Sequence, residues 1–376
     1  MSIAFIDLQA QRRALGSKVD EAIARVLDRG DFIQGQEVRE FESALATFTS
    51  AAHVVTCANG TDALTLVAMA EGLGAGDAVF VPAFTFVATA EAFSLLGMTP
   101  YFVDVDPNTF NMDVNSLKAG IADAKALGLS PRMVVPVDLF GQPADYTAIA
   151  PVAKQENMIL VADAAQGLGA SLHGKQVGTL ADYTTTSFFP AKPLGCYGDG
   201  GAVLCADADK AALIRSLTQH GKGTEKYDNV RVGLNSRLDT LQAAILLEKL
   251  KIYEGELAAR DAVANRYKDA LKDVCETPRL LSGATSSWAQ YTLKVTNRDA
   301  MQSALKAAGV PTAVYYPMPL NRQGGYRDCP LVPGGVPVSE ALASQVLSLP
   351  MHAYLDAASQ DVICNAVAQT MKSGSV

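Results

Sequence analysis

Lys192 lies in a part of the chain where a lysine is unusual. It stands between Pro190 and Pro193, in a mostly apolar and glycine-rich loop at residues 187–201. Partial burial near a cation would lower the pKa of this amine and leave it neutral, which is the nucleophilic form. The alternative is a lysine whose stem lies along a turn while its charge stays in water. The setting therefore permits a nucleophilic amine without requiring one.

A carboxylate follows a predicted buried strand at Asp163, and Gln166 follows it at the distance of one helical turn. A carboxylate in this position is costly unless a positive or hydrogen-bonding group accompanies it. A helix N-cap or an arginine would be the ordinary partner, and a protonated pyridine nitrogen would be a more specialised one. Gln166 would face the same side as the carboxylate.

Residues 57–62 join a predicted strand to a predicted helix. Asn-Gly favours a turn, and Thr61-Asp62 then opens the helix, whose free N–H groups, hydroxyl and positive dipole end could bind a phosphate. Taken alone, an ordinary helix cap by Thr or Asp is the stronger interpretation. Phe86 follows the next strand and could stack on a flat ligand, although alone it is better explained as a core residue.

Together these residues meet the requirements of pyridoxal phosphate. A lysine can form the imine, and an aspartate can keep the ring nitrogen protonated so that the ring accepts electrons. An aromatic side chain can cover the ring, and the Gly-Thr pair with Ser187 can hold the phosphate. The order along the chain, with the phosphate site first and Lys192 last, is also that of fold-type I pyridoxal phosphate enzymes.

These residues need a scaffold that brings several strand ends together. Short apolar runs predict strands at 53–56, 78–82, 101–105, 133–137, 158–162, 182–187 and 201–205. Helix-like segments of roughly ten to fifteen residues separate the first five. Nearly continuous apolar runs are typical of strands buried on both faces of a mostly parallel sheet. We therefore predict an α/β doubly wound domain, with its ligands at the carboxyl ends of the strands.

The rest of the chain predicts helices over the first 50 residues, a long helix at about 236–271 and a small α+β domain at the end. In that domain we expect helices at 299–308 and 337–347, and further elements at 288–295, 312–316 and 356–372. A polar stretch at 274–285 carries Pro278 and Gly283 and suggests a boundary. We predict a large domain at 1–275, including the N-terminal helices, and a small one at 276–376.

Composition narrows the function further. The 376 residues are 49% hydrophobic and carry a net charge of −8, which argues against nucleic-acid binding. We expect no signal peptide and no membrane span. The six scattered cysteines form no CxxC pair, so we expect reduced thiols, a cytoplasmic location and no metal site.

With these residues in view, the chain resembles the nucleotide-sugar aminotransferases of the DegT/StrS type along essentially its whole length. The most specific matching segments are residues 59–64, 85–89, 163–166, 187–201 and 233–239, and residues 5–8, 31–35 and 349–352 also match. The resemblance implies a fold-type I aminotransferase with a mostly parallel central sheet, flanking helices and a small C-terminal α+β domain. It also implies pyridoxal 5'-phosphate as cofactor.

By that resemblance, Lys192 is the Schiff-base lysine and later moves the proton, and Asp163 pairs with the pyridine nitrogen. Gln166 would bond the phenolic oxygen of the cofactor, and Phe86 would cover its ring. The phosphate would be held by Thr61, Ser187 and the amides of Gly60 and Asp62. Asn235 would reach that phosphate from the second subunit of a homodimer. The substrate would lie near Arg237, Tyr316 and Asn321.

The chain also departs from the family pattern. Gln166, Asp138 and Asn321 stand where many relatives have histidine, while Lys192 argues against the dehydratase branch, in which histidine replaces it. We expect an aminotransferase that moves an amino group from glutamate to a nucleotide-linked keto sugar. Residues 188–201 favour C3 of a UDP-3-keto-N-acetylhexosamine or its uronic acid. A 4-keto-6-deoxy sugar acceptor, a dehydratase and a non-catalytic regulator remain as alternatives.

Overall fold

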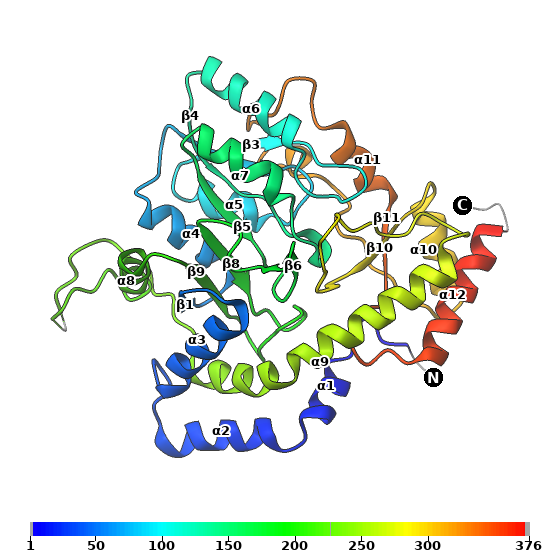
Figure 1. Cartoon of the computed structure of the whole chain (residues 1–376), viewed down its shortest axis with the longest axis horizontal. Helices are drawn as coiled ribbons and strands as arrows, with labels where there is room; N and C mark the ends of the chain where they lie inside the picture. Colours follow the sequence, from blue (N-terminus) through cyan, green and yellow to red (C-terminus); the bar gives the residue numbers. More distant parts are fainter. Residues whose placement is uncertain (1–2, 226, 373–376) are drawn as a thin grey trace.

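The structure, a computed structural model, describes residues 3–225 and 227–372. Seven strands form one sheet in the order β1-β9-β8-β5-β4-β2-β3 (Figure 1). They are β1 (His53–Cys57), β2 (Asp77–Pro82), β3 (Thr99–Val103), β4 (Ser130–Val134), β5 (Ile159–Asp163), β8 (Tyr183–Ser187) and β9 (Gly201–Cys205). Only β9 runs against its neighbours, β1 and β8. The predicted mostly parallel sheet is confirmed.

Both faces of the sheet are buried. Alternate residues of β1 and β9 point to opposite sides, so that Val54 and Leu204 pack toward α3 and α9, whereas Val55 and Val203 pack toward α4. The flanking helices are α3 (Gln36–Thr49), α4 (Gly60–Ala70), α5 (Ala88–Ser94), α6 (Val114–Ala126), α7 (Tyr146–Gln155), α8 (Ala208–Leu217) and α9 (Thr240–Leu271). Burial on both sides explains why the strand sequences are almost continuously apolar.

The 32 residues of α9 connect the sheet region to a second hydrophobic core (Figure 1). Near the end of α9, Val263, Tyr267 and Leu271 pack with β10 (Tyr291–Lys294), α10 (Arg298–Ala307) and α12 (Ala357–Lys372). This core contains residues from both sides of the predicted boundary at 275/276, which itself stays a prediction.

One detail of the C-terminal prediction is wrong. The predicted helix at 337–347 ends earlier, because α11 spans Pro337–Gln345 and β11 (Val346–Leu349) pairs antiparallel with β10. All four residues of β11 are buried, so pairing with β10 satisfies backbone groups that are cut off from water. Residues 312–316 form no strand within the described chain, and only Ala313 bridges to Ser348.

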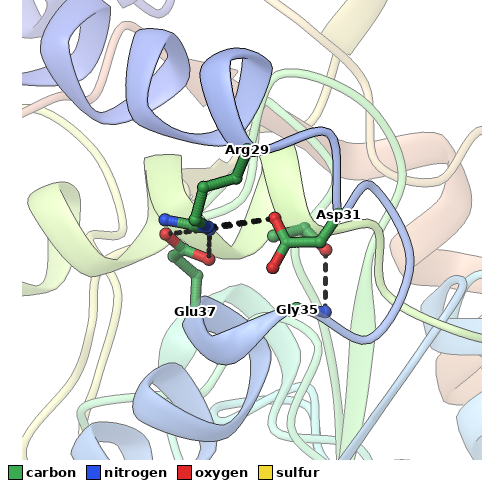
Figure 2. A network of polar contacts seen from close by, with 5 residues as sticks. Arg29, Asp31, Gly35 and Glu37 are labelled. Atoms are coloured by element: carbon green, nitrogen blue, oxygen red, sulfur yellow. Dashed lines mark hydrogen bonds and ion pairs between the residues drawn. The ribbon is translucent and has the colours of Figure 1, made fainter.

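The turn between α2 (Lys18–Arg29) and α3 is fixed to the start of α9. Arg29 donates to Glu37 at 2.6 and 2.8 Å and to Asp31 at 3.1 Å (Figure 2). The Gly35 amide donates to the Thr240 hydroxyl at 3.0 Å, and the Thr240 amide donates to the carbonyl of residue 32 at 2.9 Å. The segment at 31–35 therefore holds the N-terminal helices against α9.

No helix of the described residues is both long enough and apolar enough to cross a membrane. The longest one, α9, carries charged residues from Glu248 onward.

Replacing Gly35 by alanine should weaken this junction. A Cβ there would lie 2.6 Å from the Thr240 methyl group and 2.9 Å from the Asp31 carbonyl oxygen. We expect Gly35→Ala to reduce the free energy of unfolding in urea by about 1–3 kcal/mol. The control is Gly255→Ala on the exposed side of α9, where a Cβ meets nothing within 4 Å. It should stabilise by up to about 1 kcal/mol, and equal effects of the two substitutions would contradict the packing argument.

Candidate active site

The carboxyl ends of β1, β5 and β8 open onto one cavity of about 660 Å³. Most of the site residues predicted from the sequence line it, namely Gly60, Thr61, Asp62, Phe86, Asp163, Gln166, Ser187, Lys192 and Tyr316. They come from segments that lie far apart in the chain. The parallel strands explain their meeting, because the ends of such strands share one edge of the sheet.

Asp163 is buried at the end of β5. Its Oδ2 accepts a hydrogen bond from the Thr89 hydroxyl at 2.8 Å, and its Oδ1 accepts one from the Ala165 amide at 3.2 Å. Burial raises the pKa of this carboxyl, and the two hydrogen bonds and the charge of Lys192 oppose that rise. Among the described residues Asp163 forms no ion pair with a lysine or arginine. A positive ligand atom would therefore supply what the carboxylate lacks.

Lys192 lies in the loop between β8 and β9, partly buried, and its side chain lines the same cavity. Its backbone amide donates to the Phe189 carbonyl at 2.8 Å. Burial lowers the pKa of the Lys192 amine, while the negative charge of Asp163 acts in the opposite direction. The expected nucleophilic character is thus supported by desolvation.

Gln166 is held in one orientation. Its Oε1 accepts from the Phe140 amide at 2.6 Å, and its Nε2 donates to the Tyr316 hydroxyl at 3.2 Å. The Tyr316 ring lies 6.1 Å from the ring of Phe86, measured between centroids. These side chains form one wall of the cavity, with polar groups near Gln166 and aromatic surface at Phe86.

The start of α4 comes close to the end of β8. A Cβ on Gly60 would lie 2.8 Å from the Ser187 Cβ, and one on Gly201 would lie 2.3 Å from the Asn59 carbonyl oxygen. Glycine at both positions therefore lets the helix N-terminus approach Ser187. The free amides and the dipole of α4 make this corner suited to an anion.

The cap of α4 is Asn59, not Thr61 or Asp62. Its side-chain oxygen accepts from the Asp62 amide at 2.8 Å. The Asp62 amide, which the resemblance assigned to phosphate, is thus already bonded in this structure. The amides of Gly60 and Thr61 precede the first helical hydrogen bonds and have no acceptor within the helix.

Three predicted residues do not line the cavity of this chain, namely Asn235, Arg237 and Asn321. Asn235 is exposed on the segment before α9 and accepts a hydrogen bond from Arg237. Asn321 donates to Glu340 at 3.2 Å, and its side-chain oxygen is buried without a partner among the described residues.

Several lining residues were not identified from the sequence. They are Ile6, Glu91, Asp199, Gln290 and Tyr315. Gln290 has a buried amide oxygen without a hydrogen-bond partner in the described chain. Ile6 and Asp199 fall inside the matching segments 5–8 and 187–201, whereas no periodic or motif signal in the sequence marks Glu91, Gln290 or Tyr315. Among the described lining residues Lys192 is the only cation, whereas Asp62, Glu91, Asp163 and Asp199 are acidic. No cluster suited to a metal ion occurs among the residues that the structure describes.

Asp138 lies just behind this site. It is fully buried, its amide donates to the Asp163 carbonyl at 3.0 Å, and its Oδ1 accepts from Ala144 and Tyr146. Its Oδ2 has no partner in the described structure. Desolvation raises the pKa of Asp138 to about 7, with the charge of Asp163 adding to the rise.

One protein-family model matches most of the chain. Residues 14–368 match the DegT/DnrJ/EryC1/StrS aminotransferase family. A UDP-2-acetamido-2-deoxy-3-oxo-D-glucuronate aminotransferase from Pseudomonas aeruginosa is 49% identical, over 97% of this chain and 99% of its own. A UDP-N-acetyl-3-dehydro-alpha-D-glucosamine 3-aminotransferase from Acidithiobacillus ferrooxidans is 37% identical, over 94% of each chain.

Solved structures agree in fold. A DegT DnrJ EryC1 StrS aminotransferase from Brucella abortus superposes with a TM-score of 0.96 at 50% identity, covering 97% of this chain and 98% of its own. NtdA from Bacillus subtilis, solved with bound cofactor PMP, superposes with a TM-score of 0.87 at 29% identity, covering 98% of this chain and 83% of its own.

The buried Asp138 predicts a measurable dependence of stability on pH. Its pKa in the folded protein, about 7, lies above the value near 4 expected in the unfolded chain. The unfolded state therefore releases this proton first, so the carboxyl costs stability as pH rises from about 4 to 7. Asp138→Asn removes the titration. Measured in urea at pH 5 and pH 8, the wild-type protein should lose a few kcal/mol more than the variant on going to pH 8, on the order of 1.4 kcal/mol per unit. Parallel losses in both proteins would refute the assignment.

Proposed function

The chain belongs to the DegT/DnrJ/EryC1/StrS aminotransferase family, and from this premise we propose which amino-group transfer it performs. As a member, it is a pyridoxal-phosphate-dependent sugar aminotransferase. The proposed acceptor is the C3 keto group of a UDP-linked 3-keto-N-acetylhexosamine or its uronic acid, and the proposed donor is glutamate. The observation that carries the proposal is one cavity that joins Lys192, the buried Asp163 and the start of α4.

The residues present suit the cofactor. The carboxylate of Asp163 forms no ion pair in the described structure, and a protonated ring nitrogen would provide a partner for one. Gly60 and Gly201 keep the corner beside Ser187 clear of side-chain atoms, next to the free amides of α4. We propose that Ser187 and Thr61 hold the phosphate there, that Gln166 bonds the phenolic oxygen, and that Phe86 covers the ring.

Bound pyridoxal phosphate supplies an electron-withdrawing ring that makes a proton on the neighbouring carbon easier to remove. Lys192 would hold the cofactor through a covalent bond to its Nζ. Once the amino group of the donor has replaced Lys192 in that bond, the freed Nζ would act as general base and acid. Burial lowers the pKa of the Lys192 amine, so more of it is unprotonated and available as a base near neutral pH. Thr89 and the Ala165 amide fix the Asp163 carboxylate, and Phe86 and Tyr316 exclude water from one side.

Two relatives support the choice of acceptor. Their names place the keto group at C3 of a UDP-linked sugar, and one of them acts on a glucuronate. Both match almost the whole length of this chain. We therefore propose the same class of acceptor here.

Charge supports a second part of the proposal, a homodimer with shared sites. The cavity of one chain holds four carboxylates and one amine, which is a poor setting for a phosphate and a nucleotide diphosphate. The segment between α8 and α9 projects from the body (Figure 1) and carries Arg231, Asn235 and Arg237. Val230 and Val232 on it are 52% and 86% exposed. We propose that this segment inserts beside the cavity of a second copy, where Asn235 reaches the phosphate and Arg237 the nucleotide.

The proposal also includes a cytoplasmic location. The six cysteines all lie in the described chain, and each is a free thiol. Unpaired thiols favour a reducing compartment.

The deciding experiment follows both half-reactions in one cuvette. Purified protein loaded with pyridoxal phosphate should show a visible absorption band, glutamate should bleach it, and the UDP-3-keto sugar or its uronic acid should restore it. A dTDP-linked 4-keto-6-deoxy sugar is the matched control and should restore little. Lys192→Ala should lose the band and reduce turnover by at least about 10²–10⁴-fold. A band restored only by the 4-keto sugar would overturn the acceptor assignment.

Mixing two inactive variants tests the shared site. Lys192→Ala disables the site of its own chain, whereas Asn235→Asp places a negative charge against the phosphate of the partner's site. Neither variant alone should be active. After joint refolding, about a quarter of the wild-type activity should return, because about half of the dimers are hybrids and one of their two sites is intact. If Asn235 serves the site of its own chain, the mixture stays inactive.

A further inference from the structure

Lys249 is a lysine in the interior of the protein. It lies on α9, its side chain is only 1% exposed, and lysine is among the residues least often found fully buried. Its Nζ donates to the Gly195 carbonyl at 2.5 Å and lies 4.4 Å from the centre of the Tyr197 ring. Both contacts are to the loop that carries Lys192.

That loop is folded tightly on itself. The Lys192 amide donates to the Phe189 carbonyl, and the Cys196 amide donates to the Phe188 carbonyl, each at 2.8 Å. A Cβ on Gly195 would lie 2.5 Å from the Pro190 carbonyl oxygen. The backbone at Gly195 is therefore packed against the residues that immediately precede Lys192, so holding Gly195 also restrains Lys192.

Helix α9 contacts the loop at a second point. Gln242 lies seven residues, or about two helical turns, before Lys249 and so occupies the same side of the helix. Its side-chain oxygen accepts from the Tyr197 amide at 2.8 Å. The two contacts bind one carbonyl and one amide of the loop, three and five residues after Lys192.

The stability of the fold alone does not explain a buried ammonium. Desolvation lowers the pKa of Lys249 to about 8, while Glu256 and Cys196 oppose the shift. Glu256 already accepts hydrogen bonds from Gln11 and Tyr354, and the Cys196 thiol contacts the Phe188 and Gly198 carbonyls. The Tyr197 ring faces the ammonium from the loop side. An apolar side chain of similar size would avoid most of the desolvation cost.

We propose that Lys249 is a positioning residue that fixes the Lys192 loop against α9 and so sets the place of the Lys192 amine in the cavity. The ammonium aligns the Gly195 carbonyl and attracts the Tyr197 ring, and Gln242 completes the attachment. This inference rests on the proposed role of Lys192, although its structural part concerns the loop in the protein without cofactor.

The test compares Lys249→Met with Lys251→Met. The second variant replaces an exposed lysine two residues away, whose contact is with Glu248, and serves as the matched control. Amide hydrogen exchange is measured over residues 188–198 in protein free of cofactor. We expect Lys249→Met to raise exchange in this segment about tenfold or more, with the sheet strands unchanged, and Lys251→Met to match the wild type.

A second readout uses protein loaded with pyridoxal phosphate. For Lys249→Met we expect the pH midpoint of the visible band to shift and kcat to fall about tenfold or more, with KM for the nucleotide sugar nearly unchanged. Wild-type exchange and a wild-type midpoint in this variant would overturn the inference. A wild-type protein without a visible band would instead refute the proposed function, and the exchange measurement would still decide the structural part.

The test also needs a variant that folds. Should Lys249→Met fail to fold, Lys249→Gln takes its place, since it keeps a polar side chain and loses the ammonium. Faster exchange at 188–198 then supports the inference, and unchanged exchange overturns it.

Discussion

The Asp163 carboxylate is buried at the end of β5, and the groups around it must compensate for its loss of water. A charge removed from water must be compensated, and the hydrogen bonds from Thr89 and the Ala165 amide compensate it only in part. Lys192 acts on it through its charge without forming an ion pair in the described structure. The cavity is thus built around a buried negative group, and the proposed pairing of Asp163 with a positively charged ring would complete its compensation.

The antiparallel strand β9 provides the second half of the site. Gly201 pairs with Cys57 on one side and with Ser187 on the other, so the ends of β1 and β8 lie on either side of a residue without a side chain. The turn at Asn59 and Gly60 occupies the space that a Cβ would take. A sheet with only parallel neighbours would not place the start of α4 so near Ser187.

Local patterns in the sequence were sufficient for the sheet, since strands buried on both faces are apolar throughout. They also singled out Lys192 and Asp163 as candidates, because each residue type is unusual in its setting, and both line the same cavity. The cap at Asn59 was missed, since Asn, Thr and Asp are similar capping residues and only the backbone distinguishes them. The strand β11 was missed because its pairing with β10 depends on residues more than fifty positions away.

Other features lie beyond any single-chain pattern. In the proposed homodimer, the place of Asn235 relative to a cavity depends on a second copy of the chain. Glu248 and Lys249 are charged residues in the sequence of α9, yet both are buried there. The reason is tertiary, since the carbonyl that receives Lys249 belongs to a loop 54 residues earlier.

The length of α9 has a mechanical consequence. At about 1.5 Å per residue, its 32 residues form a rod of about 48 Å. One half of this rod is bonded to the Lys192 loop through Gln242 and Lys249, and the other half is packed into the C-terminal core through Val263, Tyr267 and Leu271. Neither half can shift along the axis without moving the other. The C-terminal core thus supports the far end of a helix whose near end is bonded to the Lys192 loop, so the rigidity of this core helps to fix where that loop lies.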